Sequence, residues 1–195
     1  MTAPFFSALM PWLLLAWFFQ KVIPVSSRTL RLCGAVAMSG IILMIPFQGR
    51  SLACWINSFM SSFSMPLLGI FIISILEMTF HRKIFSARDW KVVWIFGVVA
   101  SLVLYPSALG LTHIDTYSLG WAPHVLVVAV AVITIFLLWK KNRFGVLLLL
   151  ALGAFAFQLQ ASTNLWDYLI DPVFGVVSII MVLRMMIQKL SPFQK

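Results

Sequence analysis

Seven long apolar runs separated by short polar loops take up most of this 195-residue chain. The runs cover residues 1–20, 32–47, 53–80, 92–109, 122–139, 144–158 and 172–186. Most of them approach the roughly 20 apolar residues that an α-helix needs to cross the hydrocarbon core of a bilayer. Because a bilayer cannot satisfy free backbone polar groups, the pattern predicts an all-α fold, a polytopic transmembrane helix bundle of about seven spans. Six spans would result if one weak run, most readily the first or second, did not cross.

The composition agrees with a membrane protein. Hydrophobic residues make up 62% of the chain and charged residues 10%, with a mean hydropathy of +1.03, whereas a soluble domain carries roughly 25% charged residues. The formal net charge of +9 comes from short basic clusters between the apolar runs. Such clusters are typical of charges that orient a membrane protein, so nucleic-acid binding is not expected. With loops this short, residues 1–195 are predicted to form one integral membrane domain without a soluble domain.

The basic residues fall on alternate loops. Of the 14 Lys and Arg residues, all except Arg50 lie on one predicted side of the membrane. The positive-inside rule puts that side in the cytoplasm, so the N-terminus is predicted outside and the C-terminus inside. Short loops without an Asn-x-Ser/Thr sequon fit a bacterial inner membrane, with a periplasmic N-terminus. The first run carries no charge before Lys21, the reverse of a secretory signal peptide, and is therefore predicted to be a span.

The third run, residues 53–80, is longer than a crossing requires. We expect it to be tilted, or kinked at Pro66, and its composition leaves open whether it forms one helix or two. The charged segment 81–91 that follows is predicted to be a cytoplasmic loop.

The two cysteines do not indicate redox chemistry. Cys33 and Cys54 lie on opposite sides of the second run. A helix between them would hold them roughly 30 Å apart, too far for a disulfide. No CxxC pair is present, so a thiolate metal site has little support.

The segment Ser162–Pro172, STNLWDYLIDP, is the richest candidate for a functional site on the predicted outer surface. Asp171 directly precedes Pro172, a pattern that predicts an N-cap for the seventh span. If the segment is helical, Asp167 and Asp171 share one face and could hold a cation or share a proton. A solvated interfacial acid is the alternative for Asp167.

Other reactive groups are predicted on the same outer side. The candidate outer-face cluster comprises Arg50, His113, Asp115, His124, Asn164, Asp167 and Asp171. Imidazole and carboxylate groups could ligate a divalent metal or act as general acid and base, and Arg50 could hold a lipid phosphate. No HxxxH or HExxH spacing supports a metal, so the alternatives of solvated loop residues and interfacial anchors stay open. Neither a metal nor another cofactor is specified by the sequence.

Glu77 stands out because it is an acid inside an apolar run, where an ionisable group is costly. His81 lies four residues later and Arg82 follows, so an ion pair or a snorkelling side chain at the inner interface is expected. A proton- or cation-coupling role is the alternative.

No motif specifies a reaction. We therefore expect a small multi-pass inner-membrane protein that is a non-catalytic accessory or scaffold component of an envelope lipid or polysaccharide enzyme or transport system. An outer-leaflet enzyme or binder acting on a lipid or lipid phosphate is the first alternative, and a small ion or solute transporter is the second. The expected partners are another membrane protein and membrane lipids, including an anionic or polyprenyl-phosphate lipid.

Overall fold

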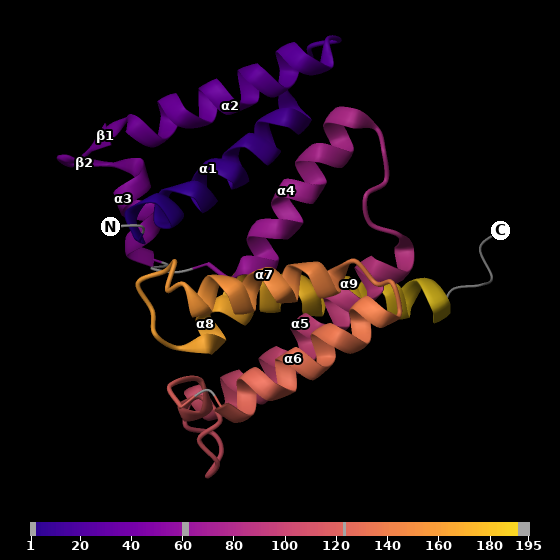
Figure 1. Cartoon of the computed structure of the whole chain (residues 1–195). Helices are drawn as coiled ribbons and strands as arrows, with labels where there is room; N and C mark the ends of the chain where they lie inside the picture. Colours follow the sequence, from indigo (N-terminus) through magenta and orange to yellow (C-terminus); the bar gives the residue numbers. More distant parts are fainter. Residues whose placement is uncertain (1–2, 60–62, 123, 191–195) are drawn as a thin grey trace.

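The computed structural model describes residues 3–59, 63–122 and 124–190, and over these ranges the fold is all-α (Figure 1). The α-helices in the described residues number nine: α1 (Ala3–Val22), α2 (Arg28–Met44), α3 (Leu52–Phe59), α4 (Met65–Phe80), α5 (Ala87–Ala108), α6 (His124–Trp139), α7 (Phe144–Ala156), α8 (Leu165–Leu169) and α9 (Pro172–Leu190). A two-residue antiparallel pair, β1 (Pro46–Phe47) and β2 (Arg50–Ser51), precedes α3. A single 3-10 turn, η1 (Ser118–Gly120), precedes α6.

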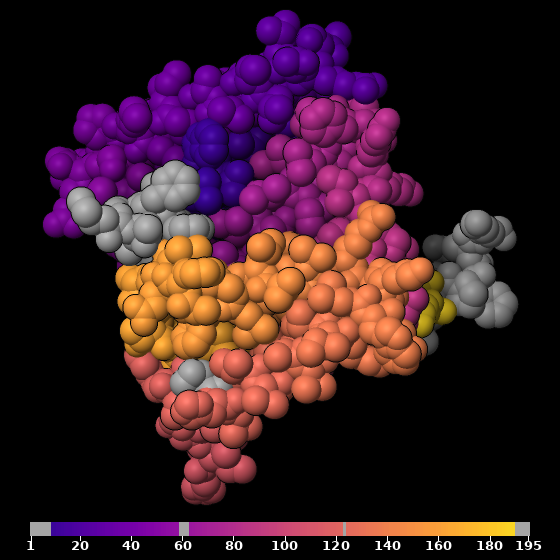
Figure 2. All heavy atoms as spheres, in the orientation of Figure 1, coloured from indigo at the N-terminus to yellow at the C-terminus, as the bar shows by residue number. Residues whose placement is uncertain are grey.

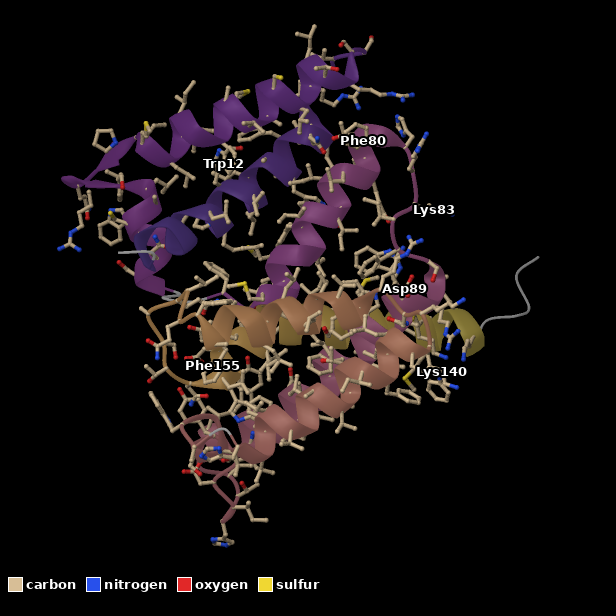
Figure 3. The ribbon with its side chains drawn as sticks, in the orientation of Figure 1. Trp12, Phe80, Lys83, Asp89, Lys140 and Phe155 are labelled. Atoms are coloured by element: carbon tan, nitrogen blue, oxygen red, sulfur yellow. The ribbon has the colours of Figure 1, made fainter. Side chains whose placement is uncertain are left out.

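The helix connections gather at two opposite ends of the molecule (Figure 1). One end, which we call the basic end, holds the α1–α2, α4–α5 and α6–α7 connections and the C-terminal part of α9. The opposite end holds the β1–β2 pair, the α5–α6 connection and α8. Lys83 and Lys140 lie toward the basic end and Phe155 lies toward the opposite end (Figure 3). The basic loops therefore share one end, as the sequence pattern predicts.

Helix packing divides the molecule into two parts joined through α4 and α7. α1 packs on α2 and α4, while α5 packs on α9 and α6 packs on α7. Contacts of α4 with α7 and α8 connect the two parts. In the space-filling view, α7 and α8 form the surface between the α1–α3 layer and α6 (Figure 2).

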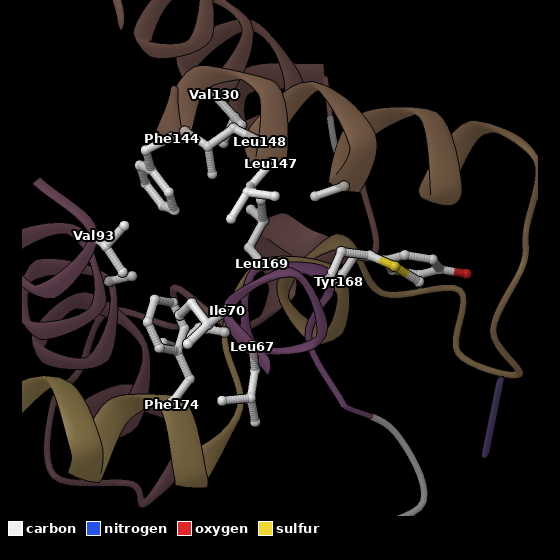
Figure 4. Close-up of a cluster of buried hydrophobic side chains, with 14 of the residues drawn as sticks. Leu67, Ile70, Val93, Val130, Phe144, Leu147, Leu148, Tyr168, Leu169 and Phe174 are labelled. Atoms are coloured by element: carbon white, nitrogen blue, oxygen red, sulfur yellow. The ribbon is translucent and has the colours of Figure 1, made fainter. Parts of the chain in front are cut away.

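The buried core lies where the two parts meet (Figure 4). Leu67 of α4, Leu148 of α7 and Phe174 of α9 are each at most 2% exposed. Tyr168 and Leu169 of α8 are fully buried in the same cluster. The short helix α8 is therefore part of the core rather than a surface loop.

Small residues bring α5 and α9 into close contact. A Cβ atom on Gly97 would lie 2.0 Å from the Ser178 hydroxyl oxygen, and one on Gly175 would lie 2.5 Å from the Ser101 hydroxyl oxygen. Both distances are too short for a carbon atom, so each glycine makes room for the opposing serine. This small-residue packing is typical of helix pairs whose backbones approach closely.

The third apolar run forms two helices, α3 and α4, which is one of the two outcomes that its composition left open. The alternative of a single helix kinked at Pro66 is wrong. Pro66 lies in the first turn of α4, where its missing N–H has no helical partner to lose. Ser64 caps this helix, and its hydroxyl oxygen accepts a hydrogen bond from the Leu67 N–H at 3.4 Å. The cap and the proline together start a helix rather than bend one.

The predicted loop 81–91 is also shorter than expected, because α5 begins at Ala87. Ser86 and Asp89 form a capping box in which each side chain bonds the backbone N–H of the other. The box extends the helix five residues before the apolar run at Val92. The other helices match their predicted runs more closely, and α9 begins at Pro172 as predicted.

Among the described residues, two helices are long and apolar enough to cross a membrane: α5 and residues 172–189 of α9. Only 17% of residues 172–189 are buried inside the protein. Residues 9–22 of α1 and helices α4, α6 and α7 are apolar but shorter. The structure thus supports an all-α fold with two helices of membrane-spanning length, and it does not by itself establish seven spans.

Candidate functional site

Asp171 joins the starts of two helices at the end opposite the basic end. One of its carboxylate oxygens accepts hydrogen bonds from the N–H and the hydroxyl of Ser64, at 2.9 and 2.6 Å. The other accepts from the N–H of Phe174 at 2.9 Å, which caps α9. Asp171 is 3% exposed. The predicted N-cap is therefore confirmed, and the same carboxylate also holds the cap residue of α4.

Two opposing effects act on the ionisation of Asp171. Burial raises the pKa of its carboxyl above the ordinary value, while the hydrogen bonds from Ser64 and Phe174 lower it. The starts of α4 and α9 add partial positive charge beside the carboxylate. Asp171 thus has a complete set of structural partners within its own chain.

Asp167 and Asp171 do not share a helical face. α8 ends at Leu169, and Ile170 has an extended backbone with φ −147° and ψ 141°. This extended residue separates the two acids, so the expected paired arrangement on one helix is wrong. The physical reason is that Asp171 starts the next helix instead of continuing α8.

α8 is held by a polar frame around Asn164. The Asn164 amide oxygen accepts a hydrogen bond from the Trp166 N–H at 2.9 Å, which caps α8, and its amide nitrogen donates to the Tyr117 carbonyl at 3.3 Å. The Trp166 indole N–H donates to the Thr116 carbonyl at 2.9 Å. A Cβ on Gly120 would lie 1.7 Å from the Asn164 amide oxygen, so this close contact requires glycine. Asn164 is therefore a buried structural residue that docks the α5–α6 connection on α8.

Asp167 has fewer structural partners than Asp171. Its carboxylate accepts a hydrogen bond from the Ser162 hydroxyl, and its side chain is half-buried. Burial raises the pKa of Asp167 above the ordinary aspartate value, and the Ser162 hydrogen bond offsets part of this effect. Within the candidate cluster, Asp167 is the acid whose structural role is smallest.

We expect Asp167→Asn to be at least as stable as the wild type above neutral pH. A raised folded pKa means that the neutral form is favoured in the folded state. The contribution of the neutral Asp167 carboxyl to the free energy of unfolding is complete below the unfolded pKa, roughly 4. It is lost as the pH rises through the folded pKa. Asparagine stays neutral and can still accept from Ser162. The melting temperature of the wild type should therefore fall more than that of the variant between pH 4 and pH 8.

Asp115→Asn, in an exposed turn, controls for general loss of one negative charge in this experiment. If the melting temperatures of the wild type and Asp167→Asn changed in parallel with pH, that result would contradict a raised pKa of Asp167. A variant that melts well below the wild type at pH 8 would show that the ionised carboxylate stabilises the fold.

The remaining outer candidates lie on separate surfaces. Asp115 accepts a hydrogen bond from the Ser118 N–H at 3.1 Å and forms an exposed turn. Arg50, His113 and His124 are exposed. β2, which carries Arg50, lies on the α1–α3 side, whereas the α5–α6 connection lies on the α6 side, with α8 between them (Figure 1). Within the described ranges, no three His, Cys, Asp or Glu side chains are grouped closely enough to hold a metal ion.

Glu77 supports the α4–α5 connection. One of its carboxylate oxygens accepts hydrogen bonds from the N–H groups of Ile84 and Phe85, both at 2.8 Å. His81 is exposed and ends α4 in the left-handed backbone region, with φ 49°. The backbone bonds give Glu77 a structural role that does not require His81.

Sequence reasoning missed the role of Asp89 at the basic end. Its carboxylate accepts from the Ser86 N–H at 2.8 Å, the Ser86 hydroxyl at 2.7 Å and the Arg143 N–H at 3.0 Å. Asp89 is 4% exposed. It lies toward the basic end (Figure 3). The Ser-x-x-Asp spacing was a visible signal for the capping box, but the bond to Arg143 depends on the tertiary fold.

No protein-family model, curated protein or solved structure matches the chain. Over the described ranges, the geometry defines an all-α protein with two helices of membrane-spanning length.

Proposed function

We propose that the chain is a multi-pass membrane protein in which α1, α2, α4, α5, α6, α7 and α9 cross the bilayer. The basic end would face the cytoplasm and the end carrying α8 would face outward. Alternation of the connections between the two ends supports this topology. α7, with 13 residues, is only about 20 Å long, so its crossing requires local thinning of the bilayer or coverage by neighbouring segments.

The exposed face of α6 supports contact with lipid or with another membrane protein. Val125, Val128, Val132 and Ile135 are between 60% and 68% exposed. These positions recur at helical spacing and form one apolar stripe. Such a surface would be unfavourable in water but is suited to a membrane.

Within that topology, we propose a non-catalytic accessory or scaffold role in an envelope lipid or polysaccharide system. The observation that carries this proposal is that all five acidic side chains accept hydrogen bonds from donors of the same chain. These residues are Glu77, Asp89, Asp115, Asp167 and Asp171.

Four of the five acids bond backbone N–H groups at a turn or helix start. A general acid or base instead needs a carboxyl group within reach of a substrate proton. The acids of this chain are arranged to stabilise the chain itself, which favours a scaffold over an enzyme.

Asp167 supports a second candidate, an outer-leaflet enzyme or binder acting on a lipid or lipid phosphate. Among the described residues, its carboxylate accepts a hydrogen bond from the Ser162 hydroxyl and from no backbone N–H group, unlike the other four acids. Burial also raises its pKa. A raised pKa is a property that a general acid would use. Asp167→Asn separates the two candidates, because asparagine preserves the shape but cannot transfer the proton.

The test of the accessory role combines purification with a cellular assay. We expect the protein, isolated in mild detergent, to elute as a complex larger than its own 22.0 kDa plus detergent, with one other protein in constant stoichiometry. Reciprocal purification through that partner should recover this chain. Asp167→Asn should keep both the complex and the cellular phenotype of the wild type.

Two results would reject the accessory role. The first is a monodisperse single chain with no stoichiometric partner. The second is a folded Asp167→Asn variant, present at wild-type level, that reproduces the deletion phenotype. That second result would favour the outer-leaflet enzyme acting on a lipid or lipid phosphate.

A further inference from the structure

A groove of about 790 Å³ opens between the two parts of the molecule at the basic end. Its walls come from α1, α4, α5 and α9. The volume is within the range of about 300–1,000 Å³ that is usual for small-molecule sites. The groove therefore has room for part of a ligand such as one lipid acyl chain.

The floor of the groove is apolar and aromatic. Trp90 and Trp94 stack with their ring centroids 5.4 Å apart, and Trp17 packs edge-on against Phe71 at 5.6 Å. Aliphatic and thioether side chains complete the floor, namely Leu67, Ile70, Val177, Met181 and Met185. Such a surface is suited to a hydrocarbon chain, and the methionines adapt to an irregular ligand.

Three cations line the groove. Lys21 belongs to α1, Lys91 to α5 and Arg184 to α9, and all three are exposed. Within the part of the chain that the structure describes, no acidic residue lines this groove. Lys21 lies over the Trp17 ring at 3.6 Å from its centroid, which places its charge beside the aromatic floor. An apolar groove lined by three cations matches an acyl chain attached to a phosphate.

A second cavity of about 650 Å³ adjoins the groove and shares Trp17, Lys21 and Ser74 with it. Its lining adds Arg28, Arg31 and His81, together with one acid, Glu77. The Glu77 carboxylate already accepts the N–H groups of Ile84 and Phe85. Gln20 also lines this cavity and is 5% exposed.

The amide of Gln20, a residue that lines this cavity, has one acceptor without a partner among the described residues. Its nitrogen donates to the Thr79 hydroxyl at 2.8 Å, while its buried oxygen has no hydrogen-bond partner among the described residues. A buried acceptor without a donor is costly. A hydroxyl group of a bound headgroup would supply the missing donor.

We propose that this groove binds one anionic glycerophospholipid from the leaflet at the basic end. An acyl chain lies along the aromatic floor, the phosphate lies among Lys21, Lys91 and Arg184, and a headgroup hydroxyl donates to Gln20. Phosphatidylglycerol has this combination of one negative charge and free hydroxyls. The proposal does not depend on the accessory role, because either a scaffold or an enzyme could carry a bound lipid.

The test is native mass spectrometry of the detergent-purified full chain, titrated with phosphatidylglycerol or with phosphatidylcholine of the same acyl composition. We expect phosphatidylglycerol to bind at one site, about tenfold more tightly than phosphatidylcholine, because Lys and Arg attract anionic headgroups. The variant Lys21→Gln/Lys91→Gln/Arg184→Gln should lose this preference.

The matched control removes three charges from the same end but outside the groove. It is Lys83→Gln/Lys140→Gln/Lys141→Gln, and it should keep the preference for phosphatidylglycerol. Val177→Trp fills the apolar floor and should weaken the binding of both lipids. Circular dichroism and size-exclusion profiles establish that each variant is folded.

Three results would overturn the proposal. The first is that the groove variant, Lys21→Gln/Lys91→Gln/Arg184→Gln, keeps the preference for phosphatidylglycerol over phosphatidylcholine. The second is that the matched control loses this preference to the same extent as the groove variant. The third is a transmembrane segment of another protein cross-linked to Val177 with lipid excluded, which would assign the groove to a protein partner. Failure here leaves the purified complex of the accessory test unaffected, so the two proposals fail separately.

Discussion

Asp171→Ala is expected to destabilise the folded protein by about 3 kcal/mol or more. The substitution removes the acceptor for the Ser64 N–H, the Ser64 hydroxyl and the Phe174 N–H in one step. These donors lie in a site where the carboxylate is 3% exposed, so water cannot easily replace the lost bonds. Thermal unfolding in a mild detergent, followed by circular dichroism, should show a clearly lower midpoint.

Ser64→Ala and the double variant complete a mutant cycle for this contact. Because the Ser64 hydroxyl donates directly to the Asp171 carboxylate at 2.6 Å, each single variant loses the same bond and the two losses should not add. Asp115→Ala, in an exposed turn, is the control for removing a carboxylate and should have a much smaller effect. Additive losses for Ser64 and Asp171 would contradict a shared bond between the two helix starts.

Asp89→Ala should have the second large effect, a loss of about 2–3 kcal/mol. Asp89 closes the capping box of α5 and also accepts from the Arg143 N–H at the turn before α7. Removing it leaves the Ser86 and Arg143 amides without this acceptor. The expected signature is a lower unfolding midpoint together with faster hydrogen exchange at the Ser86 and Arg143 amides.

Arg88→Ala provides the control for Asp89, because Arg88 is exposed one residue earlier in the same helical turn. Its effect should be within about 0.5 kcal/mol of zero. An Asp89→Ala variant as stable as Arg88→Ala would show that the connection between α5 and the α6–α7 turn does not depend on this carboxylate.

Asp171 and Asp89 have equivalent roles at opposite ends of the molecule. Asp171 joins the starts of α4 and α9, and Asp89 joins the start of α5 to the turn before α7. In each case a buried carboxylate satisfies N–H groups from segments far apart in the sequence. This use of acids explains how a chain with five acidic residues can have no assembled acid cluster among its described residues.

Local patterns in the sequence were sufficient for several features of the fold. Apolar runs located most of the helices, and the Asp171–Pro172 pair predicted both the start of α9 and its cap. The same reasoning failed at Pro66, where an apolar run continued through a helix start. It also failed at Asp167, because i,i+4 pairing requires a continuous helix and Ile170 is extended.

The sequence by itself determined the helical class, the clustering of basic residues on alternate loops and the local caps. These properties depend on hydrophobicity and on hydrogen bonds within a few residues, which the linear order specifies directly. Only the tertiary structure decided that Ser64 meets Asp171, that Arg143 meets Asp89, and that Lys21, Lys91 and Arg184 line one groove. The physical reason is that these contacts depend on how helices pack across the two parts of the molecule, and no local pattern specifies that packing.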